Sequence, residues 1–278
     1  MSYFQISLRR AVSGLLAAAA IGAALPAHGQ GTPSDIVLRG FQQTGDFILL
    51  INGKVDAKAG VYVNRNIPAY LVLPSAQSPI LITPREGKVQ TVQMLKVARQ
   101  KDGTLDLLAD AVLTPQGKFS LAGERVDFSA EGKKLSLSPN PPLVGLKKAA
   151  DLKVHSPEYV QSAKTYTPNA QAVAALKKQT KPVRLLVFFG SWCGHCKEVL
   201  PHLLRVEDEI RGSKIQFDYR GVPKDFKDPE VKRLDIRGVP TAVVYVNGQE
   251  IGRIENNDWG SPEVALSRLL GAPAKAGK

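Results

Sequence analysis

The chain has 278 residues, which is enough for two domains once a targeting segment is removed. Hydrophobic residues make up 44% of the sequence and charged residues 22%, a globular composition that excludes a disordered or fibrous protein. The formal net charge is +12, but basic residues are spread along the chain and aromatic residues make up only 6%, so we expect a solvated basic surface and no nucleic-acid partner.

Residues 1–29 have the pattern of a secretory signal peptide. Arg9 and Arg10 form a positive segment, residues 11–25 are apolar and rich in Ala and Leu, and Ala27-His28-Gly29 offers small residues at the cleavage positions. The apolar stretch is short for a membrane-spanning helix, so we expect cleavage, and an uncleaved anchor is the alternative. We therefore expect an exported protein with no stable membrane span after processing.

Residues 30–140 carry short runs with the two-residue hydrophobic alternation of β-strands. The predicted strands are 47–51, 61–63, 69–73, 80–82, 89–97, 104–108, 118–121, 125–128 and 135–137. Gly, Pro and Asp separate them, as in the turn signal Asn52-Gly53, which predicts an antiparallel sandwich or barrel. The segment has no Cys and no His, so its role is left open among binding, dimerisation and positioning.

A proline-rich stretch follows the β-rich segment. Three prolines among residues 139–142 resist both helix and central strand, so we predict a linker at 141–154 and a second domain at 155–273. The continuous apolar run 183–189 predicts a strand buried on both faces. The other predicted elements are helices at 170–179, from about 193, at 228–234 and at 261–270, and strands at 215–219, 242–246 and 251–254. This order predicts an α/β domain with helices on both faces of a mixed sheet.

The chain has two cysteines, Cys193 and Cys196, and both lie in one Cys-x-x-Cys sequence. An exported protein normally uses cysteines for structural disulfides, but this spacing closes too small a loop to stabilise a fold much. Cys193 follows the predicted buried strand and begins a predicted helix, where unpaired amides and the helix dipole favour an anion. Thiols in such motifs have pKa values of about 3.5–7.5 rather than about 8.5, and disulfide exchange requires the thiolate.

The position of each cysteine predicts its role. Cys193 is expected to form the mixed disulfide, and Cys196, one turn deeper in the helix, is expected to resolve it. Trp192, Gly194 and His195 complete the motif and are expected to tune the thiolate, since His195 can add positive charge or donate a hydrogen bond.

Zinc is the main alternative use of a Cys-x-x-Cys sequence. Structural zinc needs four ligands, and no second pair of Cys or His residues accompanies this one. His155 and His202 are expected at the solvated surface. We therefore expect no metal and no other cofactor.

An ordered set of features follows the cysteine pair. Pro201 lies eight residues after Cys193, the segment 236–241 reads Ile-Arg-Gly-Val-Pro-Thr, and Asn247-Gly248 forms a hairpin turn. Together with Trp-Cys-Gly-His-Cys, these features resemble the thioredoxin superfamily over about residues 155–272. The resemblance implies a thioredoxin-like fold and a thiol–disulfide oxidoreductase.

The resemblance also implies a substrate-binding loop. Pro240 would be cis and lie beside Cys193, and the backbone of Val239, with Thr241 adjoining, would hold an extended protein segment. The Gly-His dipeptide resembles protein disulfide isomerase, and Val before the proline resembles periplasmic disulfide oxidases. Both favour an oxidase or isomerase over a reductase. We expect periplasmic protein thiol and disulfide substrates and an unidentified redox partner, and we leave homo-oligomer formation open.

Two positions depart from the family pattern. Val187 stands six residues before Cys193, where family members carry a buried carboxylate, and Glu198 is expected to face solvent instead of replacing it. Residues 255–259 read Glu-Asn-Asn-Asp-Trp where the family places a glycine after the hairpin, and for Trp259 lining the groove and capping the core are equally open. The missing acid and the unassigned β-rich segment motivate one alternative, a non-catalytic binding protein on a thioredoxin scaffold. A thiol-based metal carrier is a third hypothesis.

Overall fold

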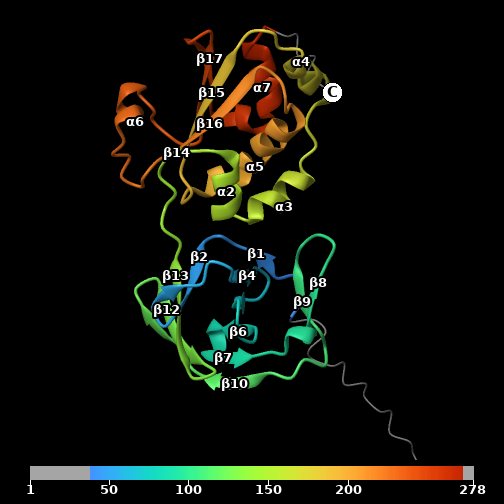
Figure 1. The fold of residues 1–278 in the computed structure, drawn as a ribbon, viewed down its shortest axis with the longest axis vertical. Helices are drawn as coiled ribbons and strands as arrows, with labels where there is room; N and C mark the ends of the chain where they lie inside the picture. The colour runs from blue at the N-terminus through green and yellow to red at the C-terminus, as the bar shows by residue number, and fades with distance from the viewer. Residues whose placement is uncertain (1–37, 272–278) are drawn as a thin grey trace, which may run out of the picture.

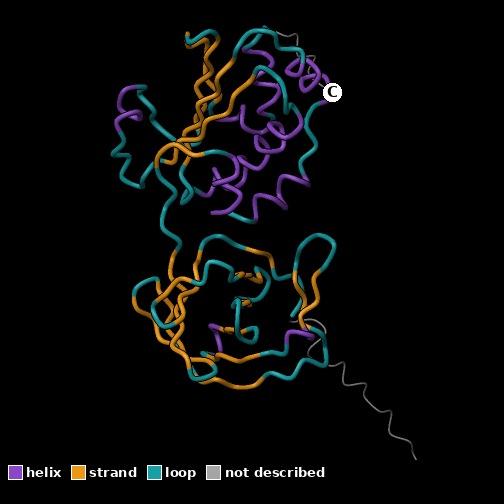
Figure 2. The backbone as a smooth tube through the Cα atoms, in the orientation of Figure 1, coloured by secondary structure: helices purple, strands orange, loops and turns teal. Residues whose placement is uncertain are grey.

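The computed structural model describes residues 38–271 of the chain (Figure 1). The predicted signal peptide and its cleavage site lie outside the described residues. Strands dominate the first part of this range and helices gather in the second, as Figure 2 shows. The predicted classes, mostly β followed by α/β, are confirmed. Between residues 38 and 271, no helix combines the length and apolarity needed to cross a bilayer.

The β-rich region, residues 38–140, contains two antiparallel sheets and a hairpin. The six-stranded sheet has the order β1 (Gln42–Gln43), β4 (Gly60–Asn64), β5 (Ala69–Leu73), β6 (Ile80–Thr83), β7 (Lys88–Thr91) and β10 (Thr114–Gly117). The five-stranded sheet has the order β11 (Ser120–Ala122), β12 (Arg125–Ala130), β13 (Lys133–Pro139), β2 (Phe47–Ile51) and β3 (Lys54–Val55). The hairpin pairs β8 (Val97–Arg99) with β9 (Leu105–Leu107).

Both faces of the six-stranded sheet are buried. Successive residues of β4 point to opposite faces, so Val61 joins the core shared with the five-stranded sheet, and Tyr62 joins a second core with Leu105 and Leu107 of the hairpin. When both faces of a sheet are covered, its strands appear in the sequence as short apolar runs. The region is therefore a sandwich with an added hairpin, one of the two architectures that the pattern predicts.

The single strand predicted at 89–97 is wrong. β7 ends at Thr91, the 3-10 turn η2 (Met94–Lys96) follows, and β8 starts a separate hairpin. Val92 is buried and its amide donates to the carbonyl of Pro79, whereas Leu95 is 89% exposed. The apolar residues there serve two different elements, so their spacing does not keep the two-residue period of one strand.

The α/β domain is built on a five-stranded mixed sheet. Its order is β14 (Gly145–Lys147), β16 (Ile215–Gly221), β15 (Val183–Phe189), β17 (Thr241–Val246) and β18 (Gln249–Ile254). Only β15 and β16 run parallel. The helices are α2 (Ala149–His155), α3 (Glu158–Thr165), α4 (Ala170–Lys177), α5 (Gly194–Glu209), α6 (Pro229–Arg233) and α7 (Pro262–Leu269), with the 3-10 turn η3 (Asn256–Gly260).

The central strand β15 is buried on both faces, which explains its continuous apolar sequence. Leu185, Val187 and Phe189 enter the larger core, which α5 and α7 cover, while Leu186 and Phe188 enter a smaller core against α6. The strand is thus buried on both faces, as the run predicted.

The segment 141–154, predicted as a linker, contains structure of the α/β domain. Residues 145–147 form β14, which pairs with β16, and Leu152 of α2 lies in the larger core. Leu143 donates its amide to the hydroxyl of Ser191 at 2.9 Å. These partners lie far along the chain, so no local pattern could indicate them.

Candidate active site

Cys193 occupies the N-cap position of α5, directly after the turn that ends β15. Its amide donates to the carbonyl of Gly190 at 2.9 Å, and its sulfur accepts a hydrogen bond from the amide of Cys196 at 3.4 Å. The cap position is normally held by an oxygen acceptor, so a sulfur there faces the unpaired amides and the positive end of the helix dipole. This geometry directs backbone N–H groups of the first turn of α5 at the Cys193 sulfur.

The two cysteines differ in accessibility. Both are free thiols in this structure; Cys193 is half-buried and Cys196 is fully buried. The amide of Gly190 lies 3.5 Å from the Cys196 sulfur. Burial raises the pKa of the Cys196 thiol, and the nearby charge of Cys193 adds to this rise, although the Gly190 amide opposes it. Only Cys193 is therefore placed to meet a large external partner.

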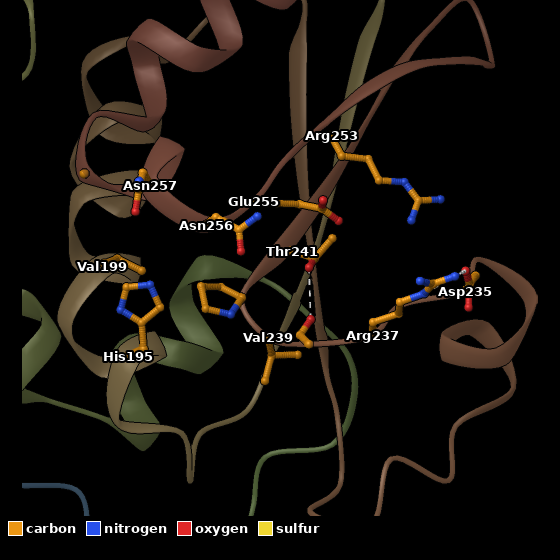
Figure 3. Close-up of a pocket in the computed structure, with 13 residues that line it drawn as sticks. His195, Val199, Asp235, Arg237, Val239, Thr241, Arg253, Glu255, Asn256 and Asn257 are labelled. Atoms are coloured by element: carbon orange, nitrogen blue, oxygen red, sulfur yellow. Dashed lines mark hydrogen bonds and ion pairs between the residues drawn. The ribbon is translucent and has the colours of Figure 1, made fainter.

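The loop before β17 lies against Cys193. The peptide bond between Val239 and Pro240 is cis, as predicted, and the Cys193 sulfur lies 3.5 Å from the carbonyl oxygen of Val239. The hydroxyl of Thr241 is 2.9 Å from the carbonyl of Gly238, to which it donates (Figure 3). Thr241 therefore stabilises the loop itself, and the backbone of Val239 is the part of the loop nearest the reactive sulfur.

A cavity of about 890 Å³, called the groove below, opens beside this loop. Figure 3 shows side chains from three elements around it: the start of α5, the loop before β17, and the end of β18 with η3. The lining residues are His195, Val199, Asp235, 237–241, Arg253, 255–257 and Gly260. Most are polar or charged, so the groove suits a polar, extended chain segment more than an apolar ligand.

The remaining motif residues, Trp192, Gly194 and His195, have separate surroundings. The indole of Trp192 donates to the carbonyl of Val222 at 2.8 Å, and Gly194 is exposed. Nδ1 of His195 lies 3.8 Å from a carboxylate oxygen of Glu198, and both side chains are largely exposed, with Glu198 facing solvent as predicted. Within the described range, no group of three His, Cys, Asp or Glu side chains is arranged to hold a metal ion.

Comparison with known proteins identifies the family. The thioredoxin family model matches residues 162–262. A thioredoxin from Malassezia sympodialis is 30% identical over 86 residues, which are 31% of this chain and 80% of that protein. The chain belongs to the thioredoxin family.

Two further matches are more partial. Protein disulfide-isomerase A5 of Mus musculus is 28% identical over 81 residues, which are 29% of this chain but only 15% of that relative's length. The crystal structure of Chlamydomonas reinhardtii thioredoxin f2 is 24% identical and covers 36% of this chain and 90% of that one, with a TM-score of 0.29. Neither match covers more than 36% of this chain.

The position of the missing acid is apolar in this thioredoxin domain. Val187 is fully buried and shares the larger core with Cys196. Helix α3, which packs on α5, contributes two other ionisable groups, Glu158 and Tyr159, near Cys196. Burial raises the pKa of Glu158 and of Tyr159, and the charge of Cys196 adds to the rise at Tyr159. In the described part of the chain, the buried Tyr159 hydroxyl has no hydrogen-bond partner.

Sequence analysis did not single out Glu158 or Tyr159, because α3 was not predicted. The stretch around them mixes polar and apolar residues without a clear period, and only Tyr159 and Ala163 of the helix are buried. The adjacent Glu158 and Tyr159 can be read from the sequence, but their burial cannot. Nothing in the local sequence indicates that they lie near Cys196, 37 positions after Tyr159.

Trp259 caps the core and does not line the groove. It is fully buried, and its indole donates to the carbonyl of Pro240 at 2.9 Å, which ties η3 to the loop. The surface position predicted for His202 is wrong: the ring stacks on Tyr166 at 4.0 Å, and burial lowers the pKa of His202. His155 is also only half exposed, because its Nε2 lies 2.9 Å from the carbonyl of Pro141.

Proposed function

We propose that this protein is a periplasmic thiol–disulfide oxidoreductase that exchanges disulfides with protein substrates through Cys193 and Cys196. The observation that carries the proposal is the asymmetry of the pair. One sulfur caps a helix and is reachable, while the other is buried one turn deeper. Such an asymmetry separates an attacking thiolate from a resolving thiol.

The exchange follows from this arrangement. In the oxidising direction, a substrate thiolate attacks Cys193 of the Cys193–Cys196 disulfide, forms a mixed disulfide with Cys193, and releases Cys196 as a thiolate that takes up a proton. A second substrate thiolate then attacks the substrate sulfur, forms the substrate disulfide, and releases Cys193 as the helix-capping thiolate. The substrate loses two electrons and the pair gains them, so a redox partner must reoxidise the pair.

In the reverse direction, Cys193 attacks a substrate disulfide and Cys196 resolves the intermediate. Cys196 must lose its proton for this step, and its raised pKa makes the thiolate scarce. The step is therefore slower than attack at Cys193, the more accessible of the two sulfurs. This asymmetry and the Gly-His dipeptide support an oxidase or isomerase over a reductase.

The groove supports a protein substrate. It is lined by Val239, whose carbonyl oxygen lies 3.5 Å from the Cys193 sulfur, and its polar walls suit the backbone of an extended segment. Strand-like hydrogen bonds to the loop would hold the substrate sulfur against Cys193.

The test compares full-length protein with Cys193→Ser and Cys196→Ser in refolding of a scrambled disulfide substrate. Cys193→Ser is expected to lose all exchange, and Cys196→Ser to accumulate a mixed disulfide at Cys193. An intact protein without activity would instead support the non-catalytic binding hypothesis. An equilibrium potential near −270 mV would support a reductase. Fractionation of cells that express the chain with and without residues 1–29 tests the periplasmic location.

A further inference from the structure

A turn of the β-rich region contacts the thioredoxin domain next to the cysteine pair. Residues 44–46 connect β1 to β2, and the amide of Gly45 donates to a carboxylate oxygen of Glu158 in α3 at 2.8 Å. The carboxylate of Asp46 forms an ion pair with the ammonium of Lys197. Lys197 directly follows Cys196 in α5. In Figure 1, α3 lies on the side of the thioredoxin domain that faces the β-rich region.

This turn, called the 44–46 turn below, is held in place on both sides. The side-chain amide of Asn140 donates to the carbonyl of Gly45 at 2.8 Å, and the backbone amide of Asn140 donates to the carbonyl of Asp46 at 2.8 Å. A Cβ atom at position 45 would lie 2.3 Å from the carbonyl oxygen of His155. Only glycine allows this close approach of two backbones, so the contact between the 44–46 turn and His155 depends on the glycine at position 45.

The ion pair places the β-rich region in the electrostatic surroundings of Cys193. Lys197 lies four residues after Cys193, one helical turn along α5 on the same side. An ammonium on the same side of a helix as a thiolate stabilises that thiolate, and a carboxylate paired with the ammonium weakens this effect. The side chain of Lys197 is 29% exposed and that of Asp46 is 49% exposed, so solvent screens the pair only in part.

Other charged groups near the cysteines come from the thioredoxin domain itself. On α5, His195 and Glu198 lie close to each other, and α3 contributes Glu158 and the buried Tyr159. Asp46 differs from all of these because it belongs to the β-rich region. It is the charge through which that region can act on the redox pair.

We propose that the β-rich region is a working part of the redox site, with Asp46 as a positioning residue that holds the Lys197 ammonium and limits how strongly it stabilises the Cys193 thiolate. The proposal rests on the proposed function, because it concerns the same cysteine pair. It gives the β-rich region a role in setting the redox equilibrium, in addition to any role in binding substrate.

The experiment measures the equilibrium constant of the cysteine pair with glutathione in full-length variants. Asp46→Asn leaves Lys197 unpaired, which stabilises the thiolate form and makes the pair more oxidising. Lys197→Gln leaves Asp46 unpaired, which disfavours the thiolate and makes the pair more reducing. We expect a change of about two- to fivefold in each case, which is about 10–20 mV, in opposite directions. Glu86→Gln is the matched control, since it breaks an exposed ion pair with Lys88 elsewhere in the β-rich region.

Opposite signs are the deciding feature, because both substitutions remove the same ion pair. If the pair only fastened the two parts together, both variants would shift the equilibrium in the same direction or not at all, and the inference would be overturned. Gly45→Ala is a second route that changes no charge. Its Cβ pushes the 44–46 turn away from His155, so its equilibrium constant is expected to change as in Asp46→Asn.

The outcomes also separate this inference from the proposed function. If the unaltered protein fails to exchange disulfides with glutathione or with a protein substrate, the proposed function is wrong. If it exchanges them normally and the Asp46 and Lys197 variants match the Glu86→Gln control, only the inference is wrong. Circular dichroism of each variant confirms that both parts remain folded.

Discussion

Trp259→Phe removes the indole N–H that holds the carbonyl of Pro240 while keeping an aromatic ring in the core. The donor lies 2.9 Å from the carbonyl oxygen, and the tryptophan is fully buried. Water cannot easily replace the lost donor at such a site. The substitution therefore leaves a buried carbonyl unpaired next to the loop that contacts Cys193.

Two contributions set the expected loss of stability. An unpaired buried carbonyl costs about 1–3 kcal/mol. The smaller ring leaves roughly 40 Å³ of unfilled volume, which adds about 1 kcal/mol at about 24 cal/mol per Å³. We expect the free energy of unfolding of the thioredoxin domain to fall by about 2–4 kcal/mol. With a urea dependence of about 2 kcal/mol per M, the midpoint falls by about 1–2 M.

The assay is urea unfolding followed by circular dichroism, because tryptophan fluorescence would change with the substitution itself. Trp192→Phe is the matched control: that indole also donates to a carbonyl, of Val222 at 2.8 Å, but Trp192 is partly exposed and water can replace it. Its expected loss is below about 1 kcal/mol. If the two variants lose the same stability, the role assigned to the buried hydrogen bond is refuted.

Three further substitutions test other parts of the structure, the first two by urea unfolding and the third by amide hydrogen exchange. Burial opposes ionisation of Asp218, but hydrogen bonds from its two basic neighbours lower its pKa overall, so its ionised form stabilises the fold above about pH 4 and this stability is lost as the pH falls through the folded-state pKa. Asp218→Asn should therefore lose about 1–3 kcal/mol at pH 7, and its difference from the parent should shrink as the pH falls below about 4. Burial raises the pKa of Glu158, so ionising this carboxyl at pH 7 lowers the stability of the fold. Glu158→Gln can still accept the hydrogen bond from the Gly45 amide. Its free energy of unfolding should be at least that of the parent at pH 7 and equal to it near pH 4. Gly221→Ala places a Cβ 1.9 Å from the carbonyl of Leu143 and should detach β14, seen as faster amide exchange over residues 143–147.

The elements best predicted from sequence are those whose signal is local. The predicted bounds of the strands at 47–51, 69–73 and 183–189 match the structure, because alternating or continuous apolar runs directly reflect which faces are covered. The helix from Cys193 and the cis peptide before Pro240 were also predicted from short motifs. Each of these signals spans fewer than ten residues and includes its own boundary.

The elements that were missed depend on partners elsewhere. Helices α2 and α3 are short and bury few side chains, and Val154 of α2 is 83% exposed, so no apolar stripe marks them. Strand β14 exists because it pairs with β16, more than 70 positions later. For the same reason, the segment 141–154 resembled a linker.

The sequence by itself determined where the candidate site lies: a Cys-x-x-Cys pair at the start of a helix and a proline loop, both encoded in a few consecutive residues. Only the tertiary structure decided what surrounds that site. It buried Trp259 in the core, brought Tyr159 close to Cys196, and paired Lys197 with Asp46, which is 151 positions away. The physical reason is that backbone conformation and hydrophobic period act between near neighbours, whereas burial and electrostatic interactions depend on distance in space and therefore on the complete fold.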